Sequence, residues 1–114
     1  MTDPDRANEN PGSEIAAAVA ALQSGDLNKA DIASKSVLAR DPYNVTALNV
    51  LGVVSRLRGD LDRARRLFTA AVDKAPSNQW SLVNLGTSLA AVGKFEDAIS
   101  VFKKAKDIHA DLIT

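Results

Sequence analysis

Apolar residues recur at helical spacing through the middle of the chain and then stop at short polar breaks. Between residues 45 and 58 they fall at Leu48, Leu51, Val54 and Leu57, which indicates a helix with one buried stripe. Gly59–Asp60 interrupts the pattern, because glycine favours a helix stop and aspartate is a good N-cap. The pattern predicts one helix before this break and a second helix after it.

The second stripe follows the break and ends at a proline. Its apolar members are Leu61, Ala64, Leu67, Phe68, Ala71 and Val72. Pro76 prevents further helix, and Ser77 or Asn78 can cap the next one. Residues 45–78 are therefore predicted to form two antiparallel helices joined by a tight turn. Neither helix can bury its stripe alone, so neighbouring units must stack.

The same sequence pattern of two helices and their turn repeats every 34 residues. The columns that match in all three copies are Gly25, Gly59 and Gly93; Leu27, Leu61 and Phe95; and Ala30, Ala64 and Ala98. Three units follow, over residues 11–44, 45–78 and 79–112. The chain is predicted to be all-α, with a polar, disordered tail over residues 1–12 and one repeat domain over residues 13–114.

Two glycines lie in the middle of predicted helices. Gly52 and Gly86 cost helix stability relative to alanine, so we expect another helix to cross too closely for a Cβ. We expect Ala64 and Ala98 on the other side of that crossing, with Phe68 and Phe102 filling the space between units.

With these features the chain resembles the tetratricopeptide repeat (TPR) family, whose 34-residue pattern is W-x2-L-G-x2-Y, then A-x3-F, then P. The second unit places Leu48, Leu51, Gly52, Ser55, Ala64, Phe68 and Pro76 in these slots, and the third places Leu82, Leu85, Gly86, Leu89, Ala98, Phe102 and Ala110. The first copy is degenerate, with Glu14, Ala17, Ala18, Ala21, Ala30, Ser34 and Pro42. The resemblance covers 102 of 114 residues. It implies an α-solenoid that winds as a right-handed superhelix, and protein binding in a concave groove lined by the first helix of each unit.

The resemblance also implies which side chains face that groove. The predicted partner-binding residues are Asn49, Val53, Arg56, Trp80, Val83, Asn84 and Thr87, with Ile15, Val19, Leu22 and Thr46 beside them. Trp80, the sole tryptophan, is either a binding hot spot or a residue that closes the packing between units. Asn49 and Asn84 either hold a ligand backbone or lie solvated on an exposed face.

The groove chemistry predicts a largely apolar partner. Family members that bind a carboxylate chaperone tail use a clamp of Lys, Asn, Asn, Lys and Arg. The corresponding slots here are Ile15, Val19, Val50, Trp80 and Asn84, which supply no cation for a carboxylate. An amphipathic helix or an extended apolar peptide fits the residues that line this groove better than a carboxylate tail does.

Composition narrows the class of protein further. The charges balance at 14 Lys+Arg against 14 Asp+Glu, which argues against nucleic-acid binding. Zero Cys and one His, His109, leave little for a metal site, a cofactor or a nucleophilic triad, so we expect no cofactor and no enzyme activity. The apolar run Ile15–Leu22 is too short for a membrane span and lacks the basic flank of a signal peptide, which predicts a cytoplasmic chain.

Two further features leave alternatives open. Five arginines cluster within eleven residues: Arg56, Arg58, Arg63, Arg65 and Arg66. We interpret them as a solvated outer helix face, on which Asp62 pairs with Arg66, rather than as a site for an anion. The third unit closes at Leu112 without an extra capping helix, so the chain is interpreted as a fragment or as a unit that another copy covers.

The leading prediction is an adaptor or scaffold that captures a peptide or helix in its groove. The alternatives are self-assembly through the C-terminal end into a homo-oligomer, and the N-terminal regulatory arm of a larger enzyme.

Overall fold

The computed structural model describes residues 11–113, and this part of the chain is built from α-helices alone. The helices are α2 (Pro11–Ser24), α3 (Leu27–Arg40), α4 (Val45–Leu57), α5 (Leu61–Lys74), α6 (Gln79–Ala91) and α7 (Phe95–Ile113). The predicted all-α solenoid of three helix pairs is confirmed. The predicted tail overlaps α2 by two residues, because α2 begins at Pro11, and the rest of it lies outside the described residues.

The turn inside each pair follows the predicted chemistry. Gly25, Gly59 and Gly93 have φ values of 83°, 87° and 82°, a left-handed conformation that glycine adopts at low cost. Asp26 and Asp60 then cap α3 and α5, accepting hydrogen bonds from the backbone N–H groups three residues on, at 3.1 and 3.2 Å. Each glycine stops one helix, and the next helix starts within two residues.

Asparagines cap the helices that begin each new pair. Asn44 Oδ1 accepts from the Ala47 N–H at 3.0 Å, and Asn78 Oδ1 accepts from the Ser81 N–H at 2.9 Å. The sequence predicted Ser77 or Asn78 for the second cap, and the structure uses Asn78. The loops before α4 and α6 therefore end with the N-cap that starts the next helix pair.

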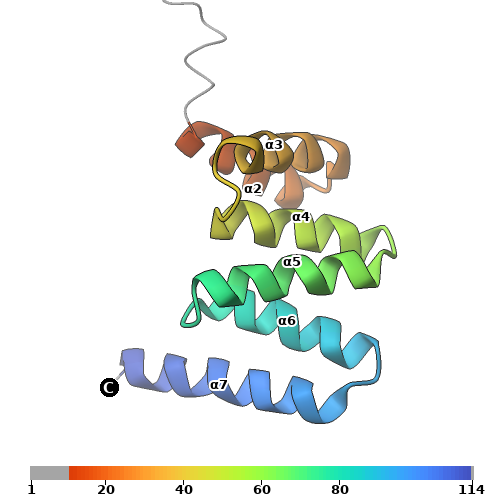
Figure 1. Cartoon of the computed structure of the whole chain (residues 1–114). Coiled ribbons are helices and arrows are strands. Elements are labelled where there is room, and N and C mark those ends of the chain that lie inside the picture. Colours follow the sequence, from red (N-terminus) through yellow and green to blue (C-terminus); the bar gives the residue numbers. More distant parts are fainter. Residues whose placement is uncertain (1–10, 114) are drawn as a thin grey trace, which may run out of the picture.

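The pairs stack in one direction, from α2 and α3 to α6 and α7 (Figure 1). The first helices of the pairs, α2, α4 and α6, contact one another in sequence. Within the described residues α3, α5 and α7 do not contact one another, so they form a separate outer row. The central helix α4 packs against four other helices, and residues 47–55 on it are all buried.

The mid-helix glycines make room for phenylalanine rings. A Cβ built on Gly52 would lie 2.4 Å from Phe68 Cε1, and one on Gly86 would lie 2.6 Å from Phe102 Cε1. The close approach was predicted with Ala64 and Ala98 opposite the glycines, but the atoms nearest to each built Cβ belong to Phe68 and Phe102. The second helix lays its phenylalanine ring, rather than its alanine, over the glycine of the first helix.

Candidate partner-binding surface

The predicted binding residues come from α4 and α6, whose direct contact places them on one continuous row of first helices. The structure divides them into two sets. Trp80, Val83, Thr87 and Arg56 keep solvent-accessible surface, whereas Asn49, Val53 and Asn84 are buried.

The accessible set lies mostly on α6. Trp80 and Val83 are 37% and 41% exposed, although α6 is otherwise largely buried. Thr87 follows on the same face, one turn further, and its hydroxyl donates to the Val83 carbonyl oxygen at 2.8 Å. The spacing of three and four residues makes these side chains one stripe along the helix. We call Trp80, Val83 and Thr87 the α6 stripe.

Arg56 supplies a cation near the C-terminal end of α4, where a positive charge is favourable to the helix dipole. It is half-buried, so its aliphatic stem contributes apolar surface while its guanidinium remains available. Because α4 and α6 contact each other, the α6 stripe and the Arg56 guanidinium belong to one row of first helices, which can accept an apolar segment and a single carboxylate.

Val53 belongs to the core instead of the binding surface. It is 8% exposed and clusters with Ala64 and Phe68, with Leu22 and Leu85 packed alongside. The prediction that Val53 faces a partner does not agree with this burial, because the neighbouring helices on both sides close over it.

Asn49 and Asn84 form a buried hydrogen-bond chain between the second and third units. Asn84 Nδ2 donates to Asn49 Oδ1 at 3.3 Å, and Asn49 Nδ2 donates to Ser81 Oγ at 2.7 Å. Ser81 Oγ in turn donates to Asn78 Oδ1, the cap of α6, at 3.1 Å. Neither sequence interpretation of these asparagines, ligand contact or solvated face, fits this arrangement. Their amides pair with each other because α4 and α6 lie face to face.

A second polar contact, between the first and second units, was not foreseen. Arg58 Nη1 lies 2.7 Å from Asp31 Oδ2, and Arg58 Nη2 donates to Asn28 Oδ1 at 2.6 Å. Lys35 pairs with the other oxygen of Asp31 at 2.8 Å. The signal in the sequence was Asp31 itself, a carboxylate in the slot that holds Ile99 in the third unit.

The ion pairs set the charge state of Asp31. Burial raises the pKa of the Asp31 carboxyl, but hydrogen bonds and charge from Lys35 and Arg58 outweigh burial and lower it overall. Within the arginine cluster, the structure pairs Asp62 with Arg65 at 3.7 Å rather than with the predicted Arg66. At least one member, Arg58, makes inter-unit contacts with Asp31 and Asn28 although its side chain remains partly exposed.

Among the described residues, no group of three or more His, Cys, Asp or Glu side chains is placed to hold a metal ion. No helix in that part of the chain combines the length and apolar character needed to cross a membrane.

The geometry defines a helical-repeat solenoid, and the comparisons name its family. Two tetratricopeptide repeat profiles match residues 15–79 and residues 56–112. The chain belongs to the tetratricopeptide repeat family. It is therefore a protein-interaction or scaffold module in the general sense that this family defines.

Solved structures show the same fold within longer chains. A mutant of the Thermobaculum terrenum O-GlcNAc transferase superposes with a TM-score of 0.85 at 31% identity, over 97% of this chain and 21% of that one. MamA RS-1 superposes at 0.80 with 17% identity, over 91% of this chain and 58% of that one. MamA MSR-1 gives 0.75 with 22% identity, over 94% and 62%. No curated protein matches the chain with significance.

Proposed function

We propose that the protein is an adaptor that binds an apolar or amphipathic peptide segment of a partner protein along the α6 stripe. The observation that carries this proposal is the exposure of Trp80 and Val83 on a first helix of the stack. A tryptophan and a valine on one turn form an apolar anchor site, and large aromatic residues dominate binding energy at interfaces.

The charge of the surface favours the same partner. Arg56 is the cation of the predicted set, and the asparagines that could have held a peptide backbone are used inside the fold. An amphipathic helix would lay its apolar face on Trp80 and Val83 and direct one acidic side chain toward Arg56. In this proposal the chain acts by binding, without catalysis and without a cofactor, and its cytoplasmic location stays a prediction.

Selection of amphipathic helical peptides from a display library provides the test. Because Trp80 is the only tryptophan, its fluorescence emission reports directly on occupancy of the α6 stripe. We expect selected peptides to shift the emission to the blue. We expect Val83→Asp to weaken binding about tenfold or more, since a charge replaces a central apolar contact.

The matched control is Ile32→Asp, which places the same charge on an apolar residue that is 71% exposed on α3. It should leave peptide affinity unchanged. Peptides that bind Val83→Asp as tightly as the original chain, or that leave the Trp80 emission unmoved, would contradict the proposal.

A second candidate function rests on the transferase comparison. This chain spans 21% of the O-GlcNAc transferase at 31% identity, so an array of this kind can form one part of a larger enzyme. We propose the N-terminal regulatory arm of an enzyme as that alternative. An immunoblot of the native host with an antibody against this chain distinguishes the two, because a band far above 12.1 kDa supports the arm and a band at that mass opposes it.

A further inference from the structure

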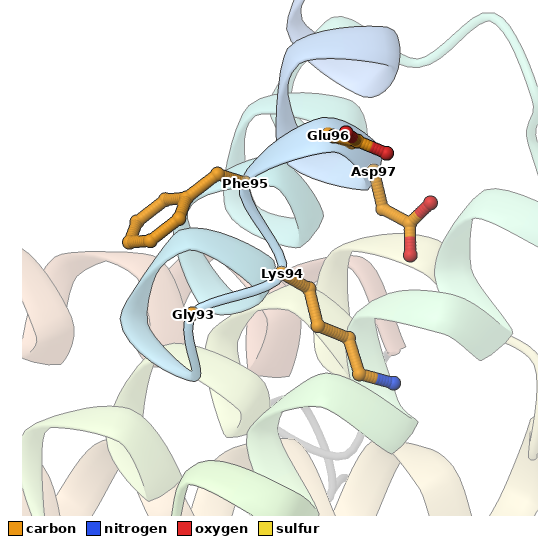
Figure 2. A pocket seen from close by; sticks show the side chains of 5 residues that line it. All are labelled: Gly93, Lys94, Phe95, Glu96 and Asp97. Atoms are coloured by element: carbon orange, nitrogen blue, oxygen red, sulfur yellow. The ribbon is translucent and has the colours of Figure 1, made fainter.

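An apolar stripe along α7 has no partner within the described chain. Phe95, Ile99 and Phe102 are 64%, 66% and 38% exposed, and α6 is the one described helix that packs against α7. Figure 2 shows the Phe95 side chain at the start of α7 pointing away from those of Lys94 and Asp97. We call Phe95, Ile99 and Phe102 the α7 stripe. A hollow of about 440 Å³ opens beside Phe95.

The preceding unit shows what this position normally does. Phe68 lies 34 residues before Phe102 and is 0% exposed, because Leu85 of α6 packs against its cluster. Both phenylalanines cover a glycine of their own unit in the same way. At Phe102 the α7 stripe therefore offers the same packing surface that is buried at Phe68, and here it is open.

The spacing of the stripe is that of a helix-pairing seam. Residues 95, 99 and 102 alternate steps of four and three, as the apolar positions of a coiled coil do, and Lys106 takes the next position. On one side the seam is bounded by Ala98 and Ala105, which are buried. On the other side it is bounded by two exposed charges seven residues apart, Glu96 and Lys103.

These two flanking charges are self-complementary. Glu96 comes before the midpoint of the stripe and Lys103 after it, and neither makes an ion pair with another side chain that the structure describes. If a second α7 runs antiparallel, Glu96 of each helix comes near Lys103 of the other. In a parallel arrangement the charged flank of one helix would face the Ala98 and Ala105 flank of the other and leave both charges unpaired, so the charge pattern favours the antiparallel one.

We propose that a second copy of this chain covers the α7 stripe, with the two α7 helices antiparallel about a twofold axis between Ile99 and Phe102. Ile99 then packs against the partner subunit's Phe102, and this contact occurs twice. The Lys106 stem lies against the partner subunit's Phe95, where its ammonium can interact with the ring face. Glu96 pairs with the partner subunit's Lys103 on the solvent side of the seam.

The other end of the stack is a poorer partner for the same stripe. Head-to-tail stacking would place α7 against α2, whose exposed residues include Ala16, Ala20 and Gln23. In the slot of Leu85, the leucine that packs against the Phe68 cluster, α2 has Ala17. The α7 stripe therefore matches another α7 stripe better than it matches α2.

Sedimentation equilibrium of the whole chain tests the dimer. We expect a mass that rises with concentration from 12.1 kDa to twice that value and then stays constant. Ile99→Asp should raise the dissociation constant about tenfold or more, because it puts a charge at the centre of the apolar seam. Ile32→Asp is again the matched control and should dimerise like the unchanged chain, with circular dichroism checking that both variants are folded.

A charge exchange tests the antiparallel register. Glu96→Lys alone and Lys103→Glu alone each create two like-charge contacts per dimer and should weaken self-association several-fold. Mixing the two variants should restore a dimer, because the lysine that replaces Glu96 in one variant then faces the glutamate that replaces Lys103 in the other. The remaining contact of the mixed dimer is the original one between Glu96 and Lys103. The double variant should also self-associate as the unchanged chain does.

Several results would overturn the proposal. These are a chain that stays at 12.1 kDa at millimolar concentration, assembly that continues beyond two copies, or a mixture of the charge variants that fails to recover. A longer native chain that stays monomeric would also overturn it, because a following helix would then cover the stripe. The α6 stripe is independent of this seam, so Val83→Asp should leave the dimer intact and Ile99→Asp should leave peptide binding intact.

Discussion

At the residue scale, the buried side-chain amides of two asparagines join the second unit to the third. Asn49 is 0% exposed, and both polar atoms of its amide are used, one by Ser81 and one by Asn84. A buried hydrogen-bond chain of this kind fixes the register of two helices, because a shift of one residue would leave several polar groups unsatisfied.

Removing the central amide should therefore destabilise the fold. We expect Asn49→Ala to lower the free energy of unfolding by about 2 kcal/mol, because it leaves the buried Asn84 amide without its acceptor and removes one of the two hydrogen-bond partners of Ser81 Oγ. Gln23→Ala removes an exposed amide on α2 and should cost no more than about 0.5 kcal/mol. Urea unfolding followed by circular dichroism compares them, and equal losses would show that the buried chain adds no stability.

The two mid-helix glycines provide a paired prediction. Gly52→Ala places a Cβ against Phe68, whose ring is fully enclosed and cannot move away, so overpacking should exceed the helix-propensity gain of about 1 kcal/mol. Gly86→Ala meets Phe102, whose ring is 38% exposed and can turn outward. We expect Gly52→Ala to lower the thermal midpoint and Gly86→Ala to change it little; the reverse order would contradict the assignment.

At the scale of the helices, the contact between α3 and α4 joins the first unit to the second. Arg58 follows the end of α4 and reaches Asp31 on α3, so this ion pair joins the first two units much as the amide chain joins the next two. The lowered pKa of Asp31 makes this joint depend on pH.

Because the folded pKa of Asp31 lies below its unfolded value, the unfolded chain binds more protons as the solution becomes acidic. The stabilisation is fully present above about pH 4, the unfolded pKa of an aspartate, and is lost as the pH falls through the lowered folded pKa. Asp31→Asn should reduce stability at neutral pH, and the difference from the unchanged chain should shrink below about pH 4. Urea midpoints measured across this range check the prediction, and a constant difference would contradict it.

Local chemistry in the sequence was sufficient to predict the helix pairs. Gly59 and Asp60 act within a few residues of their own position, so the turn between α4 and α5 could be inferred without knowing the rest of the fold. Asn49 and Asp31 could not be placed in this way. Their partners lie 32 and 27 residues away along the chain. The local sequence around a polar helical residue does not distinguish a solvated position from one that contacts another unit.

At the scale of the whole molecule, stability should decrease from the centre of the stack toward α7. Helix α4 packs against four helices, whereas α7 packs against one. In a stack with nearest-neighbour coupling, the less covered end opens first. In hydrogen exchange at low concentration, where the chain is a monomer, we expect α4 amides to be the most protected and α7 amides to exchange through a partial opening. Equal protection in both helices would show a single cooperative unit.

The arrangement of the rows also has a consequence for how the chain reaches its fold. Every contact between described helices joins elements that are adjacent or one apart along the chain, and the outer helices α3, α5 and α7 do not meet. Such short loops close at low entropic cost, and proteins dominated by local contacts fold in about microseconds to milliseconds. Helices α2 and α3 can therefore pair while the rest of the chain is still being synthesised, and each later helix adds to a surface that already exists.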